Sequence, residues 1–162
     1  MRRVIAPTAL VITVVIAVVT AVVGLGPSPS GAAREVKASA KFTIELGDQS
    51  GRYDFGQSRI TESQLDATPQ VPVSLHAGPK NDPFREFALA GRVKKGSQPT
   101  SEAVALLLSV DVGNQSMLMN STDGECTVRA KTLTKSRIAG SFTCDTTYGD
   151  QPLKAKGTFK AR

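Results

Sequence analysis

The two cysteines of this 162-residue chain bound the segment that most restricts its fold. Between Cys126 and Cys144, apolar and polar side chains alternate on both sides of Lys135, which is the period of a strand with one buried face. The segment therefore predicts a β-hairpin with an odd-numbered loop around Lys135. The register that follows is Cys126 opposite Cys144, Val128 opposite Phe142, Ala130 opposite Gly140 and Thr132 opposite Ile138.

The hairpin places both cysteines at directly opposed positions. In such a pair the Cβ atoms lie close enough for a disulfide, so we predict a Cys126–Cys144 bond. Two unpaired, buried cysteines acting as small hydrophobic residues are the alternative. A metal site is not predicted, because two cysteines and the single histidine, His76, do not complete a tetrahedral ligand set. We predict no cofactor.

The N-terminal 33 residues predict export. Arg2 and Arg3 precede an almost wholly apolar stretch over residues 4–25, which is typical of an export signal. Small residues favour cleavage after Ala32 or Ala33; alternatively, the apolar stretch is long enough to stay in the membrane as a helical anchor. Either outcome predicts a secreted or cell-envelope protein, in a compartment where disulfides persist.

The rest of the chain predicts one β-domain over residues 41–162, after a flexible lead-in over residues 34–40. Ala103 to Val112 has the start signal of a helix, but its alternating Val and Leu residues favour a strand. The strands that we expect cover residues 41–46, 52–55, 71–75 at a sheet edge, 84–93, 103–112, 116–120, the two arms of the cysteine hairpin and 153–160.

Turn-forming residues separate these strands. We predict loops over residues 56–70 and 76–83, an exposed turn over residues 94–99, and a hairpin turn at Asp123-Gly124. Eight or nine short antiparallel strands joined in this way indicate a β-sandwich or a partly open β-barrel.

Positive charge gathers at the C-terminal end of the sequence. Residues 126–162 carry eight basic and two acidic side chains, whereas residues 34–125 carry ten basic and twelve acidic ones. Such a field attracts anionic partners, although an ordinary solvated strand face is the simpler interpretation. The residues that we expect to bind an anionic partner are Arg129, Lys131, Lys154, Lys156 and Lys160.

Catalytic signals are weak. His76 follows a predicted edge strand, but no Gly-x-Ser-x-Gly motif accompanies it. The pairs Asp48/Asp54 and Asp123/Glu125 could bind calcium or act as acid and base, yet they lie in turns, where aspartate is common for backbone reasons. Basic residues without interleaved aromatic ones make nucleic-acid binding an unfavoured prediction.

The C-terminal motifs resemble those of a known group of proteins. Asp-Gly-Glu-Cys-Thr-Val-Arg-Ala, Ala-Gly-Ser-Phe-Thr-Cys and Lys-Gly-Thr-Phe-Lys-Ala lie within residues 123–162. This portion is similar to the closing part of small exported β-proteins and lipoproteins of actinobacterial cell envelopes. The resemblance implies a surface or secreted β-domain. The chain lacks the lipid-attached cysteine of the lipoproteins, which leaves membrane retention to the N-terminal segment.

These observations together predict a non-enzymatic, exported β-domain with a binding or structural role. Its basic C-terminal face would meet an envelope polymer, a lipid head group or an acidic protein, and membrane contact would require that the N-terminal segment is retained. A carrier of a small apolar ligand and a secreted hydrolase that uses His76 or a carboxylate pair are the alternatives.

Overall fold

A computed structural model describes residues 35–61, 73–79, 81, 82 and 84–162. The predicted export segment over residues 1–33 and most of the predicted loop over 56–70 lie outside these residues. Among the described residues, no helix is long and apolar enough to span a membrane. The strands are β1 (Glu35–Leu46), β2 (Gln49–Thr61), β3 (Val73–Ala77), β4 (Glu86–Gly91), β5 (Gly96–Pro99), β6 (Val104–Val112), β7 (Gln115–Ser121), β8 (Cys126–Thr134), β9 (Arg137–Tyr148) and β10 (Gln151–Ala161).

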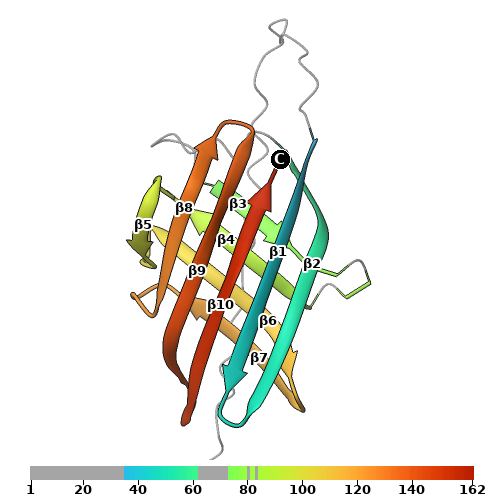
Figure 1. Cartoon of the computed structure of the whole chain (residues 1–162), viewed down its shortest axis with the longest axis vertical. Coiled ribbons are helices and arrows are strands. Elements are labelled where there is room, and N and C mark those ends of the chain that lie inside the picture. Colours follow the sequence, from blue (N-terminus) through green and yellow to red (C-terminus); the bar gives the residue numbers. More distant parts are fainter. Residues whose placement is uncertain (1–34, 62–72, 80, 83) are drawn as a thin grey trace, which may run out of the picture. The chain divides into compact units, whose positions relative to one another are not determined.

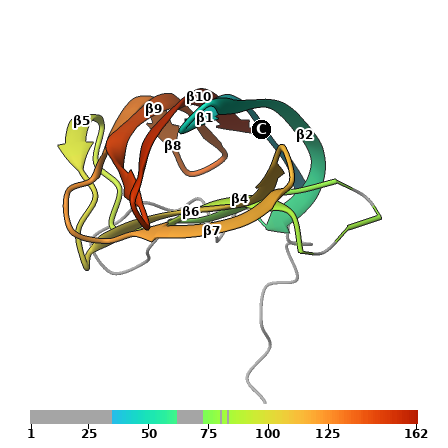
Figure 2. The same cartoon turned by 90° about the horizontal axis from the view of Figure 1, so that it is seen from below.

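The strands form two antiparallel sheets, so the predicted all-β class is confirmed (Figure 1). A six-stranded sheet has the order β2-β1-β10-β9-β8-β5, and a four-stranded sheet has the order β3-β4-β6-β7. The larger sheet curves over the smaller one, and the apolar faces of both meet between them (Figure 2). Two separate facing sheets correspond to the sandwich form of the prediction.

The hairpin of β8 and β9 has the predicted disulfide. Cys126 is opposite Cys144, with their Cα atoms 4.1 Å apart. The predicted register holds to Ala130 and then changes, because a β-bulge at Lys131 places Thr132 opposite Ala139 rather than Ile138. The bulge absorbs the odd residue of the predicted loop, so the strands close around Lys135 and Ser136, and Leu133 turns toward the core instead of Thr132.

Several segments that looked irregular in the sequence are strands. Residues 35–40, expected as a flexible lead-in, belong to β1, and Val36, Ala38 and Ala40 on its inner face are buried. Residues 56–61, expected in a loop, continue β2. The predicted exposed turn over residues 94–99 was wrong, because Gly96–Pro99 pairs with β8 as the edge strand β5. The first two segments lengthen predicted strands, and β5 is an additional strand that brings the number in the described residues to ten.

The Asp123-Gly124 turn does not close a hairpin. It links β7 in one sheet to β8 in the other, because both sides of β8 are already occupied by β9 and β5. Beside this crossing, the buried hydroxyl groups of Thr100 and Ser121 lie 2.6 Å apart, and Thr100 Oγ1 accepts a hydrogen bond from the backbone N–H of Cys126. The strand prediction for residues 103–112 was right, since β6 spans Val104–Val112.

A cluster of aromatic rings joins the two sheets. Phe42 of β1 lies 4.9 Å from Tyr53, 5.3 Å from Phe55 and 6.1 Å from Phe142 between ring centroids. Phe87 of β4 reaches the same cluster from the other sheet, with its ring centroid 5.3 Å from that of Phe142. Aromatic pairs at these separations add to the stabilisation from burial.

Gly157 makes room for this cluster in the six-stranded sheet. It pairs with Phe42 on one side and with Phe142 on the other, so two large side chains flank a position that has none. Two residues along β10, Phe159 pairs with Gly140 and Ala40, so here the large residue lies between two small ones. The two Gly-x-Phe phrases of the sequence therefore interlock across β9 and β10.

Candidate functional site

All five predicted binding residues project from the outer face of the six-stranded sheet. Arg129 and Lys131 lie on β8, whereas Lys154, Lys156 and Lys160 lie on β10, and every one is exposed. Strand parity explains the common face, because these residues occupy alternate positions and the positions adjacent to them in sequence point into the core. Strand β9 separates the two groups, and its outward residues over this stretch are short: Ala139, Ser141 and Thr143.

Strand β1 adds cations that were not predicted for this face from the sequence. Because β1 pairs with β10, its outward residues Lys37 and Lys41 stand beside those of β10. Lys37 and Lys41 both lie in residues 34–125, where acidic and basic side chains nearly balance. Lys37 also lies in the predicted flexible lead-in over residues 34–40. The available signal was the alternation of buried Val36, Ala38 and Ala40 with Lys37 and Lys41.

Strands β1 and β10 together present a line of positive charge, which we call the β1–β10 seam. It consists of Lys37, Lys41, Lys156, Lys160 and Arg162. Four successive cross-strand pairs each hold at least one of these cations, and the pairs are Thr43/Lys156, Lys41/Thr158, Ser39/Lys160 and Lys37/Arg162. The seam therefore carries positive charge at every outward cross-strand pair along this length.

Lys154 does not share the surroundings of the other four predicted residues. It is opposite Glu45 on β1 and Asp145 on β9, and its Nζ atom lies 3.9 Å from Asp145 Oδ2. The next outward pair along the strands is the first pair of the seam. Lys154 thus belongs to the acidic part of the sheet, and the seam begins at Lys156.

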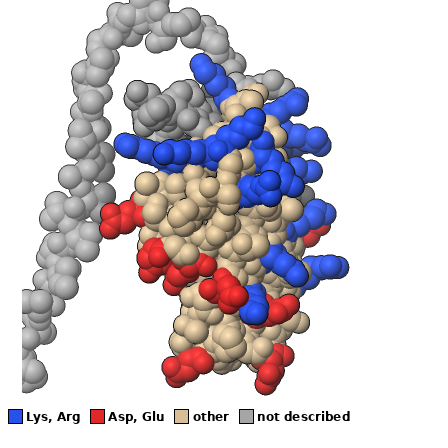
Figure 3. All heavy atoms as spheres, turned by 60° about the vertical axis from the view of Figure 1, so that its left-hand side comes forward, with Lys and Arg blue, Asp and Glu red and all other residues tan. Residues whose placement is uncertain are grey.

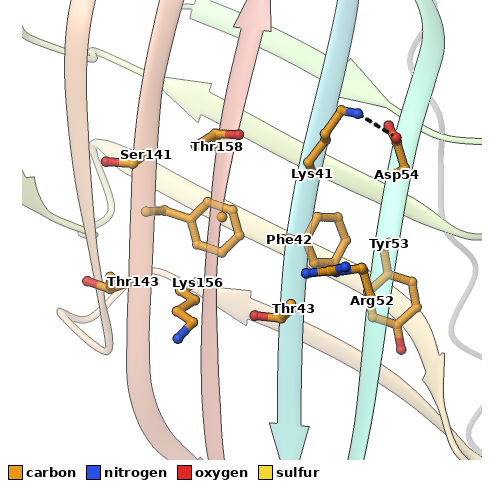
Figure 4. Close-up of a pocket in the computed structure, with 12 residues that line it drawn as sticks. Lys41, Phe42, Thr43, Arg52, Tyr53, Asp54, Ser141, Thr143, Lys156 and Thr158 are labelled. Carbon is orange, nitrogen blue, oxygen red and sulfur yellow. Dashed lines mark hydrogen bonds and ion pairs between the residues drawn. The ribbon is translucent and has the colours of Figure 1, made fainter.

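A shallow groove of about 620 Å³ crosses the middle of the outer face (Figure 4). Its floor includes Gly157, and hydroxyl-bearing side chains line it on β1, β9 and β10. Arg52 extends from β2 across β1 toward Thr43, which brings a further cation over the groove (Figure 4). The hydroxyl-bearing residues that line the groove are Thr43, Ser141, Thr143 and Thr158.

A second groove of about 320 Å³ adjoins the first and is more basic. Lys41 of β1, Lys160 of β10 and Lys131 of β8 surround it, and its remaining lining is small or apolar. Ser39, Ala139 and Thr158 keep the surface between the lysines low. Three ammonium groups around short side chains form a cradle that an anionic group can enter without displacing bulky residues.

Asp54 partly neutralises the site. Its carboxylate lies 2.6 Å from Lys41 Nζ, and the two side chains are 62% and 67% exposed (Figure 4). An exposed pair of this kind contributes little stability, because water screens it and two long side chains must be held still. Lys41 can therefore exchange Asp54 for an external anion at small cost.

Charge is segregated along the length of the sheet. Lys and Arg gather toward one end, and Asp and Glu toward the other (Figure 3). The basic end contains the β8–β9 turn and the close of β10, with Lys131, Lys135, Arg137, Lys160 and Arg162. The acidic end contains the β1–β2 and β9–β10 turns, with Glu45, Asp48, Glu125, Asp145 and Asp150.

The histidine lies on the opposite side of the molecule, on the outer face of the four-stranded sheet. His76 Nε2 is 3.4 Å from Ser74 Oγ, and its Nδ1 is 3.3 Å from Glu86 Oε2. This sequence of contacts, hydroxyl to imidazole to carboxylate, is that of a nucleophile, a base and its orienting acid. Ser74 and Glu86 were not singled out from the sequence, although Ser74-Leu75-His76 alternation already placed Ser74 beside His76.

The carboxylates of the two predicted pairs lie on strands and connections of the six-stranded sheet. Asp54 lies on the face of β2 against Lys41, whereas Asp48 lies in the β1–β2 turn. In the described part of the chain, no group of three or more His, Cys, Asp or Glu side chains is placed to hold a metal ion. Asp123 and Glu125 border the crossing between β7 and β8.

A third hollow, of about 300 Å³, is lined by Arg85, which precedes β4, and by the last residues of β6. Arg85 forms ion pairs with Asp111 and with Asp82, the latter at 3.0 Å. A hydrogen bond from Ser116 Oγ and the neighbouring guanidinium of Arg85 lower the pKa of Asp111. The charged groups satisfy one another here, so the hollow has little charge left for a ligand.

Neither the comparison with protein-family models nor the comparison with curated proteins found a match for this chain. The strongest candidate site is thus identified by its own geometry and charge, which are those of the β1–β10 seam and its two grooves.

Proposed function

We propose that this protein is an exported, non-enzymatic β-domain that binds an anionic partner on the outer face of its six-stranded sheet. The observation that carries the proposal is the seam, where four successive pairs of β1 and β10 each present a cation. The grooves beside it supply hydroxyl groups that can donate hydrogen bonds to the same partner. The partner would be an anionic envelope polymer, a lipid head group or an acidic protein.

Two independent features support export. The apolar stretch over residues 4–25 follows two arginines, and the Cys126–Cys144 disulfide belongs to an oxidising compartment. Intact mass of the protein from its host separates the two forms of the proposal. The mass of a chain that starts near Arg34 would mean a released domain. The mass of the full-length chain would mean that a helical anchor holds the domain at the membrane.

Retention on an immobilised anionic polymer tests the binding function. We expect retention on dextran sulfate beads at low salt and release as salt rises, because exposed charges are screened over about 10 Å at 0.1 M. The double variant K156E/K160E should lose retention. The single variant K160E should weaken retention, whereas the matched variant K154E has the same strand, face and charge change but lies outside the seam and should keep most of it. Retention that is unchanged by salt and by K156E/K160E would contradict the proposal.

One observation favours a second candidate, a secreted hydrolase. Ser74, His76 and Glu86 have the contact order of a nucleophilic triad, with the serine hydroxyl on Nε2 and the carboxylate on Nδ1. Hydrolysis of an activated ester that disappears in both S74A and H76A, with S39A as the matched serine control, would support it. Turnover that survives S74A would exclude this triad. The packed aromatic rings between the sheets give no comparable support to the carrier of an apolar ligand.

A further inference from the structure

The spacing of the seam defines the shape of what can bind it. Outward residues on one strand recur every second position, which is a rise of about 6.7 Å. From Lys156 to Arg162 the seam covers three such steps, or about 20 Å. Lys41 stands between Lys156 and Lys160 along this line, because it pairs with Thr158. The cations thus form a row with a nearly constant repeat.

We propose that the ligand is a linear polyol-phosphodiester chain, which lies along the β1–β10 seam with one phosphate at each cross-strand pair. This assignment rests on the proposed anion-binding function and adds the form of the anion. Three backbone bonds of an extended chain span about 3.5 Å, so a repeat of six bonds between phosphates spans about 7 Å. Such a polymer matches the repeat of the cations and needs no change of register over four phosphates.

The surroundings of the seam favour a narrow, extended ligand. The outward side chains of β9 beside the seam are short, whereas the long side chains of Lys131 and Arg129 project from β8 on the far side of β9. At one end the row meets Glu45 and Asp145, which repel an anion and so fix where the chain must stop. The site therefore has a direction and a finite length.

A nucleic acid fits this face less well than a polyol phosphate. Bases of a single strand stack on aromatic side chains, which supply much of its affinity. On the outward positions of β1, β8, β9 and β10 that the structure describes, the residues are charged, hydroxyl-bearing or small, and no aromatic side chain stands among them along the seam. The outward side chains of the seam thus favour contacts to phosphate and hydroxyl groups, and the rings of Phe42, Tyr53 and Phe142 that line the central groove belong to the packed core.

Asp54 would compete with the ligand for Lys41, so its removal is a direct test of the proposal. Its carboxylate lies 2.6 Å from Lys41 Nζ and would be replaced by a phosphate. Removal of this competitor should strengthen binding by about two- to fivefold, which is the range of an exposed ion pair.

The test measures binding of glycerol-phosphate oligomers of one, two, four and eight phosphates by calorimetry. The protein is taken in the form its host produces, with the Cys126–Cys144 bond intact. Affinity should rise steeply up to four phosphates and then level off. Between 50 and 200 mM salt, the tetramer should weaken by at most about 50-fold, the value for four contacts on a single strand. K156Q and K160Q should each weaken the tetramer and lower its salt dependence.

K154Q is the matched control, and D54N tests the competition between Asp54 and the ligand. K154Q should leave the affinity nearly unchanged, since Lys154 lies between Glu45 and Asp145, whereas D54N should increase it. Equal loss in K154Q and K160Q, or affinity that does not depend on oligomer length, would overturn the linear alignment while leaving anion binding intact. Binding to vesicles with phosphatidylglycerol but to none of the oligomers would replace the polymer by a membrane surface. No binding to any anion at low salt would overturn the proposed function itself.

Discussion

Replacement of Gly157 by alanine tests how the two sides of the six-stranded sheet depend on one another. An added Cβ atom would lie 2.4 Å from Phe42 Cβ, 2.5 Å from the backbone oxygen of Lys41 and 2.9 Å from Phe142 Cε1. The first two atoms are part of β1 or fixed to it, so rotation of a side chain cannot relieve the contact. Strand β1 would have to move by about 1 Å relative to β10 to restore ordinary packing.

The expected loss is large for a single methyl group. Overpacking of a well-filled core costs about 1–3 kcal/mol, and the upper part of that range applies because backbone must shift. We therefore expect Gly157→Ala to lower the free energy of unfolding by about 2–3 kcal/mol. A loss of that size corresponds to a fall in Tm of about 10 °C for a domain of this length.

Urea unfolding followed by far-UV circular dichroism, with the disulfide intact, measures this loss. Gly56→Ala is the control, since Gly56 lies in β2 with open space around its Cβ position and has no positive φ. That variant should be neutral or more stable by up to about 1 kcal/mol, because alanine restricts the unfolded chain. If Gly157→Ala loses no more stability than Gly56→Ala, the conclusion that Phe42 and Phe142 leave no room for a side chain at position 157 is refuted.

Three further outcomes follow from single contacts. Reduction of Cys126–Cys144, which are 18 positions apart, should cost about 3 kcal/mol, and thiol labelling should occur only after reduction; equal urea midpoints before and after would contradict this. The pKa of Asp111 is lowered in the folded protein, so its carboxylate stabilises the fold above its ordinary pKa, and this stability is lost as pH falls through the lowered pKa. Asp111→Asn should therefore reduce the fall of the urea midpoint at acid pH. Burial raises the pKa of Tyr53, so stability should fall as pH rises above about 10, and Tyr53→Phe should remove that fall.

The sequence predicts the cysteine hairpin because its evidence is local. Alternation, two cysteines and a single turn decide the pairing of Cys126 with Cys144 without knowledge of the rest of the chain. The bulge at Lys131 escaped prediction because both registers keep Val128 and Phe142 buried, and only the closing turn distinguishes them. Similarly, Asp123-Gly124 predicts the break between two strands, but it cannot show whether the following strand stays in the same sheet.

The seam could be predicted only in part, because it joins the two ends of the described domain. Lys156 and Lys160 were recognised from the charge of the last strand, but Lys37 and Lys41 lie more than one hundred positions away in the sequence. Their neighbourhood depends on which strand pairs with β10, a long-range choice that local alternation leaves open. Ser74, His76 and Glu86 show the same limit, since Glu86 reaches His76 only through the pairing of β3 with β4.

The inner and outer faces of β10 are linked by register. Gly157 accepts Phe42 beside it, and this fit holds β1 so that Lys41 stands opposite Thr158, between Lys156 and Lys160. A slip of β1 by one residue would turn its lysines inward and its apolar residues outward, which the buried face forbids. A slip by two would keep the lysines outside but would place Ala40 or Ile44 beside Gly157, and Phe42 beside Ala155 or Phe159. The packing of one phenylalanine against one glycine thus selects the register that aligns the cations.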